Sequence, residues 1–156
     1  MKPYADTNFL VSLYLEVGDF HKSRNLYAES KEQVLEVFPM TGLLWSEVIN
    51  AFQLYVFISR TQGRIRITPE SAGASSASFE EDVEQEILFE KEEITWDTMH
   101  QEIRTLSQRY TAKHGFRVYD IIHVASALIL DCDRFWSFDV KANQLAKLEG
   151  LIVNDP

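Results

Sequence analysis

Four acidic residues lie in four separate segments of the chain, and each has apolar neighbours: Asp6, Glu47, Asp120 and Asp139. A carboxylate among apolar side chains is costly to bury alone. Several carboxylates that meet at one place also repel one another unless a cation lies between them. The pattern therefore predicts a metal centre in which these four residues are the ligands and the catalytic groups.

The chemistry of the ligands predicts the ion. Mg²⁺ or Mn²⁺ prefers oxygen ligands, and is usually held by one or two carboxylates together with water and substrate phosphate. Such an ion polarises a phosphodiester, lowers the pKa of a bound water for in-line attack and stabilises the leaving oxygen. One ion is sufficient for these roles, and a substrate can bring a second.

Each of the four acids also has a simpler interpretation. Asp6, Asp120 and Asp139 stand at or near the expected starts of helices, where an aspartate commonly caps the helix N-terminus. Glu47 stands within an expected helix, where most glutamates are solvated. Capping through one carboxylate oxygen does not exclude metal binding through the other, so both interpretations stay open.

Three polar residues, His123, Asn8 and Ser137, are expected to orient the groups of the metal centre rather than bind the ion. His123 follows Asp120 by three residues and shares its helix face, but an oxygen-rich set suits a hard cation without a histidine ligand. We therefore expect His123 to be a supporting or core residue. Asn8 and Ser137 can hold a water or orient a carboxylate.

Hydrophobic periodicity and turn signals predict strands alternating with helices. We expect strands at residues 2–5, 34–38, 87–93, 134–138 and 151–153, and helices at 9–15, 20–32, 43–61, 97–112, 119–131 and 140–148. Thr7 and Asn8 offer capping oxygens to the first helix. The stretch PESAGASSAS at 69–78 is rich in serine, alanine and glycine, and predicts a mobile loop.

This order of elements predicts one α/β domain over residues 1–156, with three α/β/α layers around a central parallel sheet of about five strands. Ligands of such folds collect beyond the carboxyl ends of the strands. Asp6 and Asp139 each follow an expected strand, and Glu47 and Asp120 would reach the same edge from helices. The fold thus predicts that the four acids converge.

Composition agrees with a single soluble domain. With 156 residues and 46% hydrophobic content, the chain can bury a sizeable core. Its single cysteine, Cys132, excludes an intramolecular disulfide framework. The sequence has neither a secretory leader pattern nor an apolar run of 18 residues, so a cytoplasmic protein with no membrane association is expected.

The net charge of −9 is concentrated in one segment. Residues 80–93 contain eight acidic residues and one lysine, so the rest of the chain carries a net charge of only −2. Basic residues gather at Arg60, Arg64 and Arg66, and again at Arg109, Lys113 and Arg117. These groups are compatible with phosphate contact, although ordinary solvated faces give the same pattern.

Taken in order, the acid-bearing motifs resemble the PIN-domain family, and most closely its VapC-type toxin branch. The motifs are Asp6-Thr7-Asn8-Phe9, Ser46-Glu47-Val48, the Asp-x-x-His-x-Ala-x-Ala pattern at 120–127, and Phe135-Trp136-Ser137-Phe138-Asp139. They follow one another across nearly the whole chain, which makes the set specific although each motif alone is weak.

The resemblance implies a metal-dependent endoribonuclease that acts on RNA and is held inactive by a cognate antitoxin protein. It also implies a homodimer. Many members carry a further acidic residue just after the last aspartate, whereas this chain has Lys141 and Asn143. A tightly held second ion is therefore not predicted, and Asn143 joins the expected supporting residues.

Two other functions are considered. Aspartyl phosphohydrolases of the haloacid-dehalogenase type also begin with a strand that ends in aspartate, but they require a second aspartate two residues later, where this chain has Asn8. That class is disfavoured. A PIN-like binding scaffold with little catalysis is the other alternative, and metal-dependent cleavage of generic RNA would separate it from the ribonuclease.

Overall fold

The computed structural model describes residues 2–18, 20–31, 37–63 and 66–154. The strands are β1 (Pro3–Ala5), β2 (Phe38–Met40), β3 (Phe89–Lys91), β4 (Arg134–Trp136) and β5 (Ile152–Val153). The helices are α1 (Thr7–Tyr14), α2 (Phe20–Lys31), α3 (Gly42–Gln62), α4 (Pro69–Glu84), α5 (Trp96–Leu106), α6 (Ala112–His114), α7 (Val118–Ile129) and α8 (Val140–Leu148), with a π-helical turn η1 (Ser107–Thr111) between α5 and α6.

All described strand pairs are parallel, as predicted, but the strands form two small sheets. One sheet has the order β1-β4-β5 and the other pairs β2 with β3. The prediction of one sheet of about five strands is therefore wrong, because the larger sheet has three. Every described strand is only two or three residues long, and Pro39 in β2 has no N–H to donate, which leaves few backbone bonds with which these strands could form one sheet.

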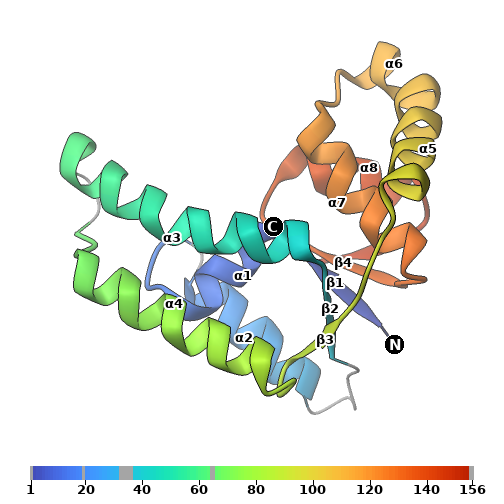
Figure 1. Cartoon of the computed structure of the whole chain (residues 1–156). Helices are drawn as coiled ribbons and strands as arrows, with labels where there is room; N and C mark the ends of the chain where they lie inside the picture. The colour runs from blue at the N-terminus through green and yellow to red at the C-terminus, as the bar shows by residue number, and fades with distance from the viewer. Residues whose placement is uncertain (1, 19, 32–36, 64–65, 155–156) are drawn as a thin grey trace.

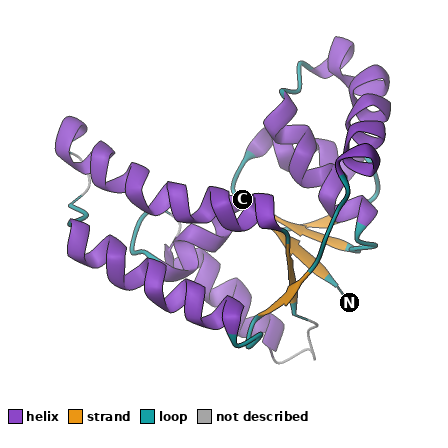
Figure 2. Ribbon diagram, in the orientation of Figure 1, coloured by secondary structure: helices purple, strands orange, loops and turns teal. Residues whose placement is uncertain are grey.

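The helices cover the strands from both sides. Figure 1 shows α1 to α4 on one side of the strands and α5 to α8 on the other, and Figure 2 shows how small the strand layer is. The two sheets share one core. The ring of Trp136 in β4 lies 5.2 Å from Phe9 in α1 and 5.3 Å from Phe38 in β2, measured between centroids. The predicted α/β/α layers are present, and no described helix has the length and apolar character needed to span a membrane.

Two helices, α1 and α8, begin at the edge of the sheet where β1 and β4 end. Ala5 pairs with Trp136 at this edge, so the residues that follow them, Asp6 and Ser137, lie side by side. The prediction that Thr7 and Asn8 cap α1 is wrong. Asp6 is the N-cap, and its side chain accepts a hydrogen bond from the backbone N–H of Phe9. An aspartate before the first turn is itself a strong cap, which frees the next two side chains for other contacts.

The predicted loop at 69–78 is wrong, because this segment forms most of the long helix α4. Thr68 caps the helix, Pro69 occupies its first turn, and the side chains of Thr68 and Ser71 bond to each other's backbone N–H groups. Ala72 and Phe79 are fully buried on one face. Val83 is also buried, and α4 packs against α3, so this segment has the composition of a loop but the packing of a helix.

If α4 is a packed helix, Ala72→Leu should lower the free energy of unfolding by about 1–3 kcal/mol, because three added carbons have no room in a filled core. Ala77→Leu is the matched control, since Ala77 lies on the exposed face of the same helix. Urea unfolding measures both variants. Equal stability of the two variants would mean that the segment does not pack as described.

Most other element boundaries agree with the predictions. The expected helix at 97–112 is interrupted by η1 and ends at Gly115, whose φ of 69° is readily adopted by glycine. The expected strand at 134–138 ends at Trp136, because the backbone N–H of Ser137 donates to the side chain of Asn154. In the expected strand at 34–38, residues 34–36 lie outside the described residues, and β2 continues through Pro39.

Candidate active site

Three of the four predicted acids, Asp6, Asp120 and Asp139, line one cavity of about 300 Å³. They reach it from the N-terminal ends of α1, α7 and α8. Asn8 and His123 also line it, and one wall is apolar and comes mainly from α3. Residues that are far apart in the chain are therefore brought together as the sequence predicted.

Asp6 is the most deeply buried of these acids, with 3% of its surface exposed. One carboxylate oxygen accepts a hydrogen bond from the Phe9 N–H at 3.0 Å, and the other accepts one from the Ser137 hydroxyl. Burial raises the pKa of Asp6 to about 7, with a smaller contribution in the same direction from the charge of Asp139, although both hydrogen bonds act against the rise. A cation beside Asp6 would relieve this cost.

Asp139 and Asp120 both serve as helix caps, which the sequence left open. Asp139 Oδ1 accepts hydrogen bonds from the N–H groups of Lys141 at 2.7 Å and Ala142 at 3.0 Å. Asp120 Oδ2 accepts one from the Arg117 N–H at 2.7 Å. Each bond uses one oxygen of its carboxylate and leaves the other for a ligand. Capping and cation binding are thus compatible at both residues.

Ser137 connects the acids to the backbone around them. Its hydroxyl donates to Asp6 and accepts from the Asp139 N–H at 2.8 Å. Its own N–H donates to Asn154 Oδ1 at 2.8 Å, and its carbonyl accepts from Asn143 Nδ2 at 2.8 Å. Ser137 is fully buried, so these four bonds fix the separation between the two aspartates. Ser137 and Asn143 thus lie beside the two aspartates, and the supporting roles predicted for them stay predictions.

Asn8 supports the same turn from α1. Its side-chain oxygen accepts a hydrogen bond from the backbone N–H of Phe138 at 2.9 Å. Phe138 lies between Ser137 and Asp139, so Asn8 ties the start of α1 to the loop that carries Asp139. The amide therefore orients backbone rather than capping its own helix.

Glu47 is not part of the cavity lining but is bonded to residues that are. Its Oε2 accepts a hydrogen bond from the Thr7 hydroxyl at 3.1 Å and lies 3.3 Å from His123 Nε2. The other ring nitrogen of His123 lies 3.2 Å from the hydroxyl of Tyr4. Burial raises the pKa of Glu47 and lowers that of His123 to about 4. A ring with this pKa is neutral at pH 7, so its 3.3 Å contact with Glu47 is not an ion pair.

The sequence did not identify three of these residues as part of the site: Tyr4, Thr7 and Asn154. Thr7 was expected to cap α1, but its hydroxyl reaches α3. Tyr4 and Asn154 act over 119 and 17 residues of sequence separation. Tyr4 lies in β1, two residues before Asp6, which directly follows that strand, and this spacing is the one local signal available for it.

The donor set suits a hard divalent cation. In the described part of the chain, no group of three or more His, Cys, Asp and Glu side chains is arranged to hold one ion. Mg²⁺ is commonly bound by one or two protein carboxylates and keeps several waters. Two carboxylates as direct ligands, with further carboxylates bound through water, therefore suit this ion. Asp6 and Asp139, joined through Ser137, fit the direct positions. Asp120 and Glu47 fit the outer ones.

The predicted basic groups are only partly available for phosphate. Arg109 forms an ion pair with Glu149 at 2.8 Å, and Arg64 lies outside the described residues. Arg117 is exposed and directly precedes α7, close in sequence to Asp120. For Arg109, the interpretation as part of a solvated face is the better one.

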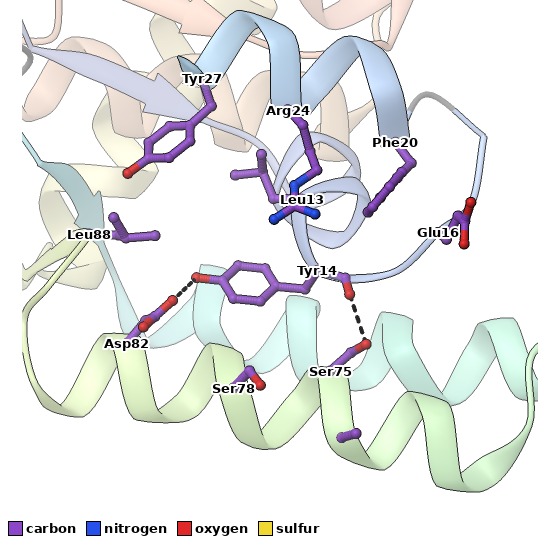
Figure 3. A pocket seen from close by; sticks show the side chains of 11 residues that line it. Leu13, Tyr14, Glu16, Phe20, Arg24, Tyr27, Ser75, Ser78, Asp82 and Leu88 are labelled. Carbon is purple, nitrogen blue, oxygen red and sulfur yellow. Dashed lines mark hydrogen bonds between the residues drawn. The ribbon is translucent and has the colours of Figure 1, made fainter. Parts of the chain in front are cut away.

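A second cavity, of about 490 Å³, lies between α1 and α2 on one side and α4 on the other (Figure 3). Tyr14 crosses it and donates a hydrogen bond to Asp82 at 2.6 Å. The cavity contains none of the residues predicted for the metal centre. The hydrogen bond from the half-buried Tyr14 joins α1 to α4 across this cavity.

Comparison with known proteins identifies the fold. No family model and no curated protein matches the sequence. Among solved structures, the chain is similar to VapC20 from Mycobacterium tuberculosis, described as a toxin that cleaves the sarcin-ricin loop. The two share 14% sequence identity with a TM-score of 0.60, and the match covers 92% of this chain and 94% of VapC20. The chain therefore has the PIN-like α/β/α fold of a VapC toxin, which confirms the predicted resemblance at the level of the fold.

Proposed function

We propose that the chain is a metal-dependent endoribonuclease that cleaves RNA phosphodiester bonds with Mg²⁺ or Mn²⁺, and that it is the toxin of a type II toxin–antitoxin pair. The observation that carries this proposal is the convergence of Asp6, Asp120 and Asp139 on one cavity. The fold shared with a VapC toxin supports the same assignment.

Asp6 and Asp139 would hold the cation, with Asp120 and Glu47 reaching it directly or through water. When bound, the cation would polarise the phosphodiester, lower the pKa of an attacking water and stabilise the leaving oxygen. Ser137 keeps the two aspartates at a fixed separation, because its hydroxyl bonds to both of their segments. The site is thus organised before substrate arrives.

Two features of the chain itself suit a phosphodiester. The N-termini of α1, α7 and α8 meet at the cavity, and their partial positive charge favours both the aspartates and an incoming phosphate. Burial raises the pKa of Glu47, which moves its carboxylate toward the range useful for accepting a proton at neutral pH. No described residue bonds to Glu47 Oε1, so that oxygen is available for this role.

The test is cleavage of a generic single-stranded RNA by the purified protein with Mn²⁺, with Mg²⁺ and with EDTA. We expect internal cleavage with either ion and none with EDTA. A folded protein that cleaves no RNA with either ion would contradict the proposal and favour the PIN-like binding scaffold.

We expect an antitoxin to bind at the same cavity. A partner that places an arginine or lysine among the carboxylates supplies the positive charge that they lack. Co-expression with the adjacent reading frame, followed by purification, tests for such a partner. The homodimer implied by the family resemblance stays a prediction, which light scattering of the purified protein can check.

The apolar side of the cavity suits a nucleobase beside the scissile phosphate. Tyr119 directly precedes Asp120, lines the cavity and has 71% of its surface exposed. Exposed aromatic rings are the usual stacking platforms for unpaired bases. Leu54 and Ile58 of α3 extend the apolar surface of the cavity.

We therefore expect Tyr119→Ala to raise the KM for RNA at least about fivefold, because stacking of one base contributes about 1–3 kcal/mol. The kcat should change little, since stacking holds substrate and transition state alike. Tyr119→Phe keeps the ring and should resemble wild type, and Val118→Ala removes an exposed neighbour that does not line the cavity. Steady-state cleavage of a fluorogenic RNA measures all three, and an unchanged KM in Tyr119→Ala would place the base elsewhere.

A further inference from the structure

Side chains hold the backbone of the loop that joins β4 to α8. The N–H of Ser137 donates to Asn154 Oδ1 at 2.8 Å. The N–H of Phe138 donates to Asn8 Oδ1 at 2.9 Å. The N–H of Asp139 donates to the Ser137 hydroxyl at 2.8 Å. Three consecutive N–H groups are therefore bonded to side chains, and two of these side chains come from segments that are far from the loop in sequence.

Asn154 takes the place of a strand neighbour for Ser137. β4 pairs with β5 through Phe135 and Val153, and Asn154 is the next residue after β5. In a regular parallel ladder, the acceptor for the next N–H would be a backbone carbonyl. The side-chain oxygen of Asn154 accepts instead, and β4 ends at Trp136. The chain can therefore leave the sheet at Ser137 with its N–H still bonded.

The burial of Asn154 indicates that this one bond is the reason for an asparagine at the position. The residue has 7% of its surface exposed, and Ser137 is fully buried. Within the described part of the chain, the side-chain nitrogen of Asn154 is buried and has no hydrogen-bond partner. An amide with an unsatisfied nitrogen is a costly way to fill a core position. The bond from Ser137 to Asn154 Oδ1 is what this side chain provides in return.

We propose that Asn154 is a positioning residue of the active site: it holds the Ser137 backbone so that the Ser137 hydroxyl lies between Asp6 and the N–H of Asp139. Asn154 does not line the cavity of the acids, and acts on it only through Ser137. The consequence for cation binding rests on the proposed function. The anchoring of Ser137 is a property of the chain alone.

This arrangement couples the packing of the last described strand to the assembly of the metal centre. The N–H and the hydroxyl of Ser137 belong to one residue, so a backbone released from Asn154 carries the hydroxyl with it. The bonds from Ser137 to Asp6 and to the Asp139 N–H are then weakened, and the two aspartates lose their fixed separation. Loss of a partner that orients a metal ligand lowers metal affinity by about 10- to 100-fold.

Three variants separate the bond from the packing around it. Asn154→Leu keeps a similar volume but has no acceptor for the Ser137 N–H. Asn154→Asp keeps an acceptor oxygen at the same place. Val153→Ala is the matched control, because it weakens the packing of the same strand and leaves the bond in place. Asn154→Ala takes the place of Asn154→Leu if leucine prevents folding.

The first measurement needs neither metal nor RNA. Hydrogen exchange of the Ser137 N–H, followed by NMR with EDTA, reports the bond to Asn154 directly. In Asn154→Leu we expect this N–H to exchange about 10-fold faster relative to the amides of β4, which corresponds to the loss of one hydrogen bond. Asn154→Asp should keep the wild-type ratio, and Val153→Ala should accelerate Ser137 and β4 alike. An unchanged ratio in Asn154→Leu would overturn the inference.

The second measurement is Mn²⁺ affinity, determined by electron paramagnetic resonance titration. We expect Asn154→Leu to raise the Kd for Mn²⁺ by about 10-fold, the lower end of the range for supporting partners, because Asn154 acts through Ser137. Asn154→Asp and Val153→Ala should bind Mn²⁺ at least as tightly as wild type does. Equal losses in Asn154→Leu and Asn154→Asp would contradict the acceptor role.

The two measurements also distinguish this inference from the proposed function. Faster exchange of Ser137 in Asn154→Leu with unchanged Mn²⁺ affinity would overturn the positioning role. A wild-type protein that binds no Mn²⁺ and cleaves no RNA would overturn the proposed function and, with it, the positioning role. An unchanged exchange ratio in Asn154→Leu, in a protein that does cleave RNA, overturns the inference alone.

Discussion

Asp6→Asn should lower kcat/KM for RNA by more than about 100-fold, beyond the range found when a supporting partner of a metal ligand is removed. Asparagine keeps the shape of Asp6 but has no charge to offer a cation. Its side-chain oxygen can still accept from the Phe9 N–H, and its amide can donate to the Ser137 hydroxyl. The fold should therefore survive while cleavage is lost.

The same variant should be more stable than wild type in EDTA at pH 8. Burial raises the pKa of Asp6 to about 7, above its value in the unfolded chain. A group with a raised folded pKa favours the fold only while it is protonated, so wild type loses stability as the pH rises from about 4 to about 7. The advantage of Asp6→Asn should grow over that range, with a ceiling of about 4 kcal/mol.

Thermal melting from pH 5 to pH 8 measures this difference. Asp82→Asn is the matched control, because Asp82 is also partly buried and accepts one hydrogen bond, from Tyr14, but lies outside the cavity of the acids. It should retain wild-type cleavage. Active Asp6→Asn protein, free of wild-type contamination, would contradict the assignment of Asp6 as a ligand.

The parts of the site that the sequence predicted share a local signal. Asp6 and Asp139 each follow a short apolar strand and precede a helix, and parallel strands place such residues at one edge. Local patterns determine this geometry, so Asp6, Asp139 and Asp120 converge in the structure as expected. The capping alternatives are also correct, because one carboxylate can serve both the helix and the cavity.

The failure at α4 has a physical cause. Serine, alanine and glycine at 69–78 carry little hydrophobic periodicity, and such composition is common in loops. The start signal was nevertheless present, since Thr68 and Pro69 form a good cap and first turn. The buried positions of this helix are Ala72, Phe79 and Val83. Only Ala72 lies within 69–78, so the part of the helix that resembles a loop carries almost no apolar pattern.

Local sequence patterns did not predict the contacts between distant segments of the chain. Asn154 bonds to Ser137 through a side chain, and Thr7 reaches Glu47 across 40 residues. Neither residue type is unusual at its position. The number of strands in one sheet was missed for a related reason, because the pairing of two- and three-residue strands depends on a few bonds rather than on a pattern of residues.

Ser137→Ala should have the second largest effect, because a single hydroxyl serves two aspartates. Its loss leaves an oxygen of the buried Asp6 and the N–H of Asp139 without these partners. Each unsatisfied buried group costs about 1–3 kcal/mol, so we expect a loss of about 2–4 kcal/mol in the free energy of unfolding. Ser23→Ala is the control, since Ser23 is equally buried and its hydroxyl donates only to backbone carbonyls.

Stability alone does not distinguish Ser137 from Ser23, but cation binding does. The hydrogen bond from Ser137 holds the pKa of Asp6 below the value that burial would otherwise impose. Without it, Asp6 binds its proton more tightly, and a cation must compete with that proton over a wider range of pH. The Kd for Mn²⁺ at pH 7 should therefore rise about 10- to 100-fold in Ser137→Ala and recover in part at pH 8 to 9. Ser23→Ala should show wild-type affinity at every pH, and a Ser137→Ala protein that did the same would mean that Asp6 and Asp139 keep their positions without Ser137.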